Sequence, residues 1–192
     1  MLRVKRLKLF NGKEISFDLS RGESLQIKGA NGAGKSLLLK SLARLIPSEW
    51  DELSLDGKRA EEFRIEEWRS KILYIPPEVV FDPELTVDEF FNEPFELLIY
   101  KDYQKKFEPR EYWPEAGELL SKLSSGQRQQ VALLRALSLD PTYLLLDEPF
   151  GYMDVERREF FSKLLRRWLQ DNRALILVSH IEGFPTTKEF FL

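Results

Sequence analysis

Gly29-Ala30-Asn31-Gly32-Ala33-Gly34-Lys35-Ser36 is the stretch that decides the fold of this chain. It fits the phosphate-loop pattern of Gly, four residues, then Gly-Lys-Ser. Glycines without a Cβ let backbone N–H groups close around phosphate oxygens. The lysine ammonium then reaches the β- and γ-phosphates, and the serine hydroxyl is a ligand for Mg²⁺. The stretch therefore predicts a binding site for ATP with Mg²⁺.

The segments beside this loop have the structure that it requires. Residues 24–28 predict a short strand, and residues 36–45 predict a helix whose positive N-terminus faces the phosphates. Leu37, in the first turn of that helix, belongs to the same predicted nucleotide site. Upstream, alternating apolar residues over 2–10 and 15–19 flank an Asn-Gly turn signal and predict an antiparallel β-piece.

Phe10 ends the first of these predicted strands and has two interpretations. In the first interpretation its ring stacks on the adenine of a bound nucleotide. In the second it is an ordinary aromatic residue of the core. The sequence favours neither.

Further along the chain, apolar strands alternate with helices, which predicts an α/β fold with a mainly parallel sheet covered on both faces. The predicted strands are residues 52–55, 71–75, 143–146 and 174–178. The predicted helices are residues 86–98, after a Thr-x-x-Glu capping box, 127–139 and 154–170.

Composition excludes several classes of protein. With 192 residues we expect one domain over 1–192. The 29 basic and 32 acidic residues leave a net charge of −3, so no nucleic-acid partner is expected. The absence of cysteine excludes a disulfide framework and a thiolate metal site. The longest apolar runs are too short to cross a bilayer, so we expect a soluble chain.

Residues 81–113 differ in composition from the rest of the chain, because they contain nine of its 24 aromatic residues and three prolines. We interpret about 81–123 as a helical insertion in the α/β core. The aromatic residues either fill the small core of the insertion or line a groove for a helix of another protein, and both can hold.

A second candidate site is Tyr143-Leu144-Leu145-Leu146-Asp147-Glu148-Pro149. A parallel strand delivers its C-terminal end to the ligand crevice, and two carboxylates there need a cation nearby. Asp147 is predicted to hold Mg²⁺, through water, together with Ser36. Glu148 is predicted to activate the attacking water as general base.

Leu123-Ser124-Ser125-Gly126-Gln127 resembles the signature motif of the ATP-binding cassette (ABC) family, usually Leu-Ser-Gly-Gly-Gln. The resemblance covers essentially the whole chain, with the motifs in the family's order. It implies a P-loop NTPase (RecA-like) core with an antiparallel β subdomain and a helical insertion. It also implies that Ser124, Ser125, Gly126 and Gln127 serve the γ-phosphate bound to a second cassette, so that ATP is sandwiched between two subunits.

Three further elements can be compared with the family. Tyr152-Met153-Asp154 resembles the D-loop, and His180 resembles the switch histidine that contacts the γ-phosphate. The segment Ile72-Leu73-Tyr74-Ile75-Pro76-Pro77-Glu78 departs from the family pattern, because Pro77 stands where the Q-loop glutamine belongs. We therefore expect slow hydrolysis with normal ATP binding.

The resemblance implies a subunit that binds and hydrolyses ATP and energises a membrane transporter. Its partners are expected to be an integral membrane permease on a separate chain, docked near residues 81–103, and a second cassette. Its location is expected to be cytoplasmic, on the inner face of the cell membrane. Two alternatives are a soluble ABC ATPase acting on nucleic acid or ribosomes, and a weakly hydrolysing regulatory subunit, which Pro77 keeps open.

Overall fold

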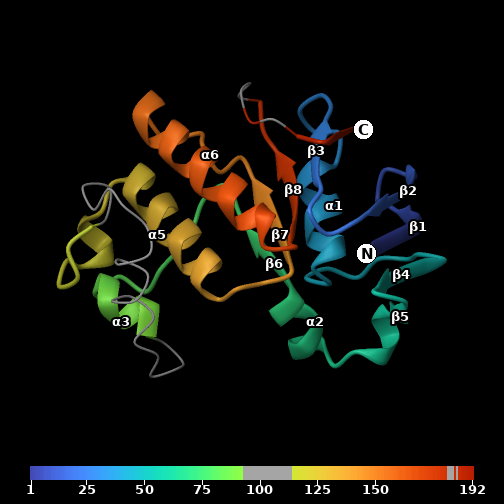
Figure 1. Cartoon of the computed structure of the whole chain (residues 1–192), viewed down its shortest axis with the longest axis horizontal. Helices are drawn as coiled ribbons and strands as arrows, with labels where there is room; N and C mark the ends of the chain where they lie inside the picture. Colours follow the sequence, from blue (N-terminus) through green and yellow to red (C-terminus); the bar gives the residue numbers. More distant parts are fainter. Residues whose placement is uncertain (93–113, 181–183, 185) are drawn as a thin grey trace.

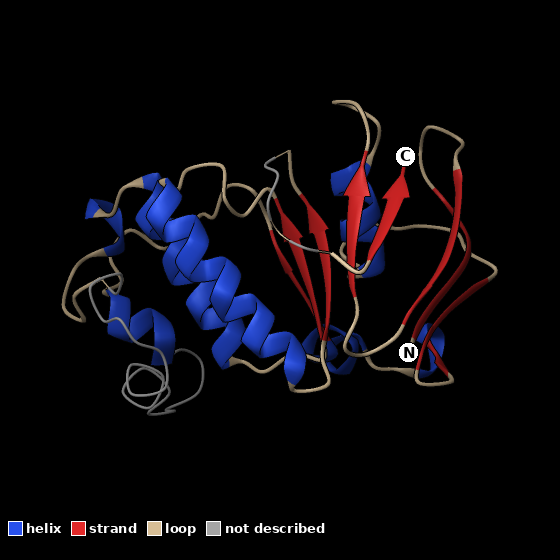
Figure 2. Ribbon diagram, turned by 45° about the horizontal axis from the view of Figure 1, so that its top comes forward, coloured by secondary structure: helices blue, strands red, loops and turns tan. Residues whose placement is uncertain are grey.

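Two β-sheets with helices between and beside them make up the computed structural model of this chain (Figure 1). The structure describes residues 1–92, 114–180, 184 and 186–192. Figure 2 shows the layers in order: a pair of long helices, a parallel sheet, a short helix, and a second sheet at the N-terminal side. The predicted α/β core with an antiparallel β subdomain is confirmed.

The antiparallel sheet has the strand order β2-β1-β4-β5. Strand β1 (Leu2–Lys8) pairs with β2 (Glu14–Leu19) on one side and with β4 (Glu52–Leu55) on the other. The short β5 (Lys58–Arg59) pairs with β4. The alternation of apolar residues predicts these strands because one face of β1 is buried, with Leu2, Val4 and Leu7 at 1% exposure or less.

The core sheet is parallel throughout, with the strand order β6-β7-β8-β3-β9. The bounds of its strands are β3 Ser24–Lys28, β6 Ile72–Ile75, β7 Tyr143–Asp147, β8 Ala174–Val178 and β9 Lys188–Phe191. The last of these was not predicted, because Lys-Glu-Phe-Phe has no strand pattern of its own. Strand β9 exists because β3 offers it a free edge.

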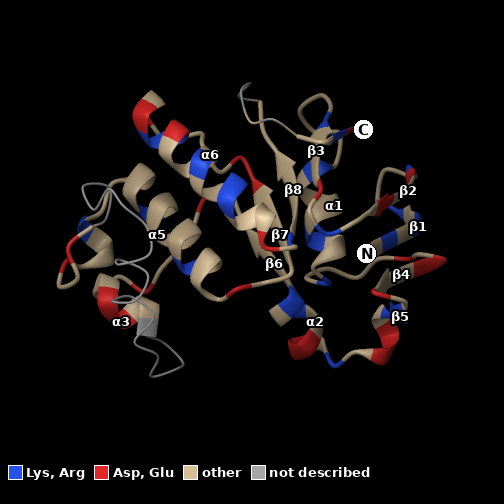
Figure 3. Cartoon of the chain, viewed as in Figure 1, with Lys and Arg blue, Asp and Glu red and all other residues tan. Residues whose placement is uncertain are grey.

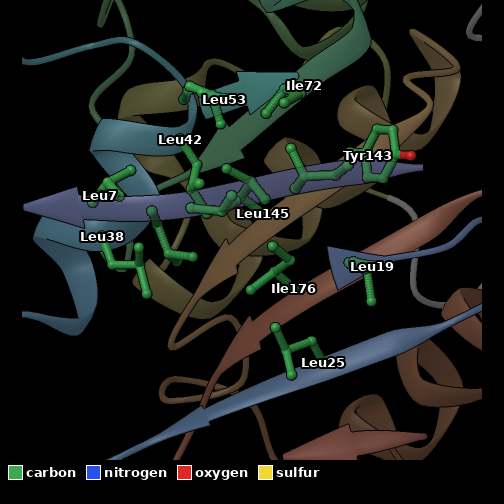
Figure 4. Packing of buried hydrophobic residues seen from close by; sticks show 14 of the residues in the cluster. Leu7, Leu19, Leu25, Leu38, Leu42, Leu53, Ile72, Tyr143, Leu145 and Ile176 are labelled. Atoms are coloured by element: carbon green, nitrogen blue, oxygen red, sulfur yellow. The ribbon is translucent and has the colours of Figure 1, made fainter. Parts of the chain in front are cut away.

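Strand alternation divides the core between the two faces of the parallel sheet. On β7, Leu144 and Leu146 pack with the long helices, whereas Tyr143 and Leu145 pack with the short helix and the antiparallel sheet. Figure 4 shows this second cluster, in which Leu145 of the parallel sheet meets residues of β1 and of the short helix. Both faces are thus buried, as the continuous apolar strands predict.

The short helix α1 (Lys35–Leu42) follows the phosphate loop, and its predicted end at residue 45 is wrong. The helix ends at Leu42 because Arg44 adopts a left-handed backbone, with φ of 53°. Helix α2 (Ile65–Lys71) was not predicted, since its one buried apolar residue, Trp68, gives no helical stripe. It also takes Lys71 from the predicted strand.

The long helices are α5 (Ser125–Ser138) and α6 (Val155–Gln170), both close to prediction. Among the described residues, 3₁₀ turns span Ala60–Glu62 and Leu120–Lys122. Helix α3 (Val87–Asn92) begins at the predicted capping box, where Glu89 accepts hydrogen bonds from the N–H and the hydroxyl of Thr86.

Part of the predicted insertion can be checked. Phe81 and Phe90 stack edge to face with ring centroids 4.6 Å apart, Phe91 is 2% exposed, and the Arg135 guanidinium lies 4.2 Å above the Phe90 ring. For these three aromatic residues the core interpretation holds. The rest of the predicted helix to residue 98 and the other aromatic residues lie outside the described residues, so the boundary 81–123 and the single domain stay predictions.

Candidate nucleotide-binding site

One cavity of about 430 Å³ opens at the C-terminal ends of the parallel strands. Three segments far apart in the sequence line it: the phosphate loop with the start of α1, the end of β7, and the end of β8. Its lining residues are Asn31, Gly32, Gly34, Lys35, Ser36, Leu37, Asp147, Glu148, Val178 and His180. The two candidate sites of the sequence are therefore one site in the structure.

The phosphate loop has the backbone that its glycines predict. Gly32 and Gly34 adopt positive φ angles of 80° and 101°, and Gly34 caps the N-terminus of α1. A Cβ at Gly29 would lie 2.8 Å from the backbone oxygen of Leu192, because the chain after β9 crosses this point. Glycine is thus required at position 29 by close packing as well as by conformation.

Lys35 is the buried cation of the site, with 8% exposure. Its Nζ donates to the carbonyl oxygens of Gly29 at 2.8 Å and Ala30 at 3.0 Å. In the described part of the chain, carbonyl dipoles and not a carboxylate hold this charge, so a phosphate can still be bound by it. The loop and the lysine therefore fit a nucleoside phosphate.

Asp147 ends β7 and is 1% exposed. Its Oδ2 accepts a hydrogen bond of 3.0 Å from the hydroxyl of Tyr74, a partner that sequence analysis missed. Burial, then the charge of Asp147 and this bond, raise the pKa of the Tyr74 phenol, so Tyr74 donates as a neutral group. This contact depends on the pairing register between β6 and β7, so no local sequence motif predicts it.

The oxygen groups at this point fit Mg²⁺. Ser36 and Asp147 both line the cavity and supply a hydroxyl and a carboxylate. Within the described ranges there is no group of three or more His, Cys, Asp or Glu residues that could hold a metal. A Mg²⁺ ion bound by one or two protein oxygens completes its shell with phosphate oxygens and water, which is its usual coordination beside a nucleotide.

Glu148 stands directly after β7 in a left-handed conformation, with φ of 48°. Such a backbone is unfavourable for a residue with a Cβ and often marks a functional site. A bond from its N–H to the carbonyl of Val178 at 2.8 Å holds it there. Its Oε2 accepts from the N–H of His180 at 3.2 Å, and the His180 Nε2 lies 3.4 Å from its Oε1. The predicted base and switch histidine are thus in contact.

Phe10 is 76% exposed, so its interpretation as a core residue is wrong. It follows Leu9, whose Cδ1 would lie 3.1 Å from a Cβ at Gly34. It precedes Asn11, whose Nδ2 donates to the carbonyl of Ala33 at 3.1 Å. Phe10 therefore stands beside the phosphate loop with its ring exposed, where it can stack on a base.

The signature residues do not reach this cavity. Ser124 caps α5: its Oγ accepts from the N–H of Gln127 at 3.2 Å, and the Gln127 Oε1 accepts from the N–H of Ser124 at 2.9 Å. A Cβ at Gly126 would lie 2.5 Å from the carbonyl oxygen of Tyr152. The signature and the D-loop are therefore packed together within one chain, with Ser125 in the first turn of α5.

The D-loop aspartate has a structural partner in its own chain. Asp154 caps α6, and its carboxylate accepts from the N–H of Arg157 at 2.9 Å and from the guanidinium of Arg157 at 2.8 Å. This cap fixes where α6 begins.

Pro77 and Glu78 are exposed, in the turn that follows β6. The Gln129 side chain of α5, 2% exposed, reaches this turn and donates from Nε2 to the carbonyl of Pro76 at 3.3 Å. A glutamine amide thus contacts this turn, but from α5 and not from position 77.

The phosphate loop, the paired carboxylates and the parallel sheet together define a nucleotide-binding cassette of the P-loop class. The family model described as ABC transporter matches residues 12–151, which is more than half of the chain. The chain belongs to the ABC transporter family.

Curated relatives agree with this assignment. The chain is 30% identical to the glycine betaine/carnitine/choline transport ATP-binding protein OpuCA of Bacillus subtilis, over 94% of this chain and 51% of the relative. It is 31% identical to the molybdate/tungstate import ATP-binding protein WtpC of Pyrococcus abyssi, over 89% of this chain and 52% of the relative. The chain thus spans about half the length of these relatives.

Solved structures share the fold. The ATP-binding subunit of an ABC transporter has a TM-score of 0.80 and 25% identity, over 94% of this chain and 79% of that one. A dimeric ATP-binding cassette in a post-hydrolysis state, bound to ADP and Pi, has a TM-score of 0.81 and 22% identity. The alignment covers 100% of this chain and 94% of that one.

Across the residues that the structure describes, none of the helices combines the length and the apolar character needed to cross a membrane.

Proposed function

We propose that this chain binds and hydrolyses ATP as the nucleotide-binding subunit of an ABC transporter, and that ATP-driven dimerisation of two cassettes energises transport. The observation that carries the proposal is the meeting of the phosphate loop, Asp147, Glu148 and His180 in one cavity. Family membership and the transport ATP-binding relatives support it.

In the proposed reaction the phosphate loop and Lys35 hold the β- and γ-phosphates, with Phe10 against the adenine. A water attacks the γ-phosphorus, the bond to the β–γ bridging oxygen breaks, and ADP and phosphate form. Glu148 accepts the proton of that water, and His180 keeps the carboxylate in place through the contacts described above. Ser36 and Asp147 would hold the Mg²⁺ ion, which would supply charge that stabilises the phosphate oxygens.

The proposed dimer follows from the separation of the two half-sites. Ser124, Ser125, Gly126 and Gln127 stand at the N-terminus of α5, which favours anions, yet they line no part of the cavity of their own chain. Two chains facing head to tail would bring the signature of one to the γ-phosphate of the other. The partner is a second copy of this chain or a similar cassette.

Charge argues against a nucleic-acid or ribosome-binding ATPase. Figure 3 shows acidic and basic residues interspersed over the described elements, and the net charge is −3. Binding to a phosphate backbone needs a positively charged surface. Glu148 and His180 argue against a regulatory subunit without hydrolysis, because the two residues proposed for hydrolysis lie in contact.

The experiment is a purification of the tagged chain from its own cells, from membrane and soluble fractions, with an assay of phosphate release from ATP. We expect the chain with the membrane fraction, at its cytoplasmic face, together with one integral membrane protein. Recovery in the soluble fraction with ribosomes or nucleic acid would overturn the transport proposal. Cross-links map the contact predicted near residues 81–103, of which residues 93–103 lie outside the described part of the chain.

A further inference from the structure

We propose that Tyr74 is a positioning residue of this site: its hydroxyl orients the Asp147 carboxylate toward the metal of the bound nucleotide. The inference rests on the proposed function and deepens it. It concerns a residue outside the phosphate loop, the carboxylate pair and the signature, on a strand that contributes no lining residue to the cavity.

The sheet brings the two side chains together. Tyr74 of β6 is the register partner of Leu145 of β7, and Asp147 lies two residues beyond Leu145 on the same strand. Side chains two residues apart on a strand point to the same face, so all three share the face that packs on α1. The aromatic ring of Tyr74 spans the remaining distance, and its hydroxyl stands 3.0 Å from Oδ2.

A hydroxyl is suited to this task because it is a neutral donor. Asp147 is 1% exposed, and a buried carboxylate needs a hydrogen-bond donor. An arginine or lysine at position 74 would satisfy it but would also cancel the charge that a cation requires. Tyrosine holds one oxygen in place and leaves the negative charge, so the other oxygen can bind the metal or its water.

The turn after β6 makes such a contact more important here. Pro77 has no side-chain amide, and the Gln129 contact holds the backbone of Pro76 and not a group of the cavity. Tyr74, three residues before Pro77 on the same strand and turn, therefore connects β6 to the metal-binding carboxylate. The strand thus contributes to the site through a phenol in place of an amide.

The test is Tyr74→Phe, which keeps the ring and removes the hydroxyl. ATP affinity is measured by calorimetry with Mg²⁺ and with EDTA, for the wild type and the variant. We expect the ratio of the ATP affinity with Mg²⁺ to the ATP affinity with EDTA to be about fivefold lower in the variant than in the wild type, which corresponds to the loss of one hydrogen bond. The affinity measured with EDTA should be unchanged. Tyr143→Phe is the matched control, since Tyr143 is buried on the next strand and lines no part of the cavity; its ratio should stay at the wild-type value.

A double-mutant cycle with Asp147→Asn shows whether the hydroxyl acts through Asp147. The loss caused by Tyr74→Phe should disappear in the Asp147→Asn background, because the residues act as a pair. An equal loss in both backgrounds, an unchanged ratio, or equal weakening with and without Mg²⁺ would overturn the inference while the proposed function stands. A wild type whose ATP affinity ignores Mg²⁺ would overturn both.

Discussion

The cavity and the signature segment use the same kinds of polar group in opposite ways. In the cavity, Lys35 is held by carbonyl oxygens and the carboxylate of Asp147 by a neutral phenol, so both charges remain for a ligand. In the signature, Ser124 and Gln127 satisfy each other, and Gly126 packs on the D-loop.

This difference separates two polar regions of one chain, which the proposed dimer would combine into one site. The cavity leaves its charged groups available to a ligand, whereas the signature lies at the N-terminus of α5, which in the proposed dimer would face the nucleotide of a second cassette. Substitutions in the cavity should therefore change binding and chemistry, and substitutions in the signature should change assembly.

The largest expected effect is that of Glu148→Gln on hydrolysis. Loss of the base should lower turnover roughly 100- to 10,000-fold, while ATP binding is kept. The ATP-bound dimer then accumulates, and size-exclusion chromatography with ATP should show a shift from monomer to dimer. Glu156→Gln, an exposed carboxylate in the first turn of α6, is the control and should hydrolyse normally. Wild-type turnover in Glu148→Gln would remove Glu148 from the mechanism.

Next comes Lys35→Ala, which removes the ammonium from the phosphate loop. Charge-assisted hydrogen bonds contribute up to about 3 kcal/mol, so ATP should bind roughly 100-fold more weakly by calorimetry. Lys13→Ala removes an exposed lysine that does not line the cavity and should leave affinity unchanged. Equal affinity in Lys35→Ala and wild type would show that ATP binds elsewhere.

Gly126→Ala tests the other side of the comparison. Its Cβ would meet the Tyr152 carbonyl, so the signature and the D-loop must move apart, at a cost of about 1–3 kcal/mol. We expect a lower thermal midpoint and no ATP-dependent dimer, with unchanged ATP affinity of the monomer. Gly151→Ala is matched, because its nearest neighbour would lie 3.6 Å away. Normal dimerisation by Gly126→Ala would contradict the role given to this contact.

The smallest effect is expected of Pro77→Gln. A restored amide adds about one hydrogen bond, so turnover should rise about fivefold without a change in ATP affinity. Glu78→Gln places the same amide one residue further and should leave turnover unchanged. If wild-type turnover is already ordinary for such a subunit and Pro77→Gln changes nothing, the missing glutamine does not limit hydrolysis.

Much of the site could be predicted from the sequence because its parts are local. A phosphate loop needs its glycines, Lys35 and Ser36 within eight residues, and a parallel strand that ends in Asp147 and Glu148 places both at the sheet edge. The capping box at Thr86 could be predicted for the same reason, since it spans only four residues.

The tertiary structure decided what depends on residues far apart in the chain. Strand β9 forms only against β3, and the Tyr74–Asp147 bond exists only because β6 and β7 pair in one register. The left-handed backbone of Glu148 likewise needs Val178 on another strand. Short-range patterns fix the loops, the caps and most of the strands. The register between strands is set by packing of the whole core, and these contacts follow from that register.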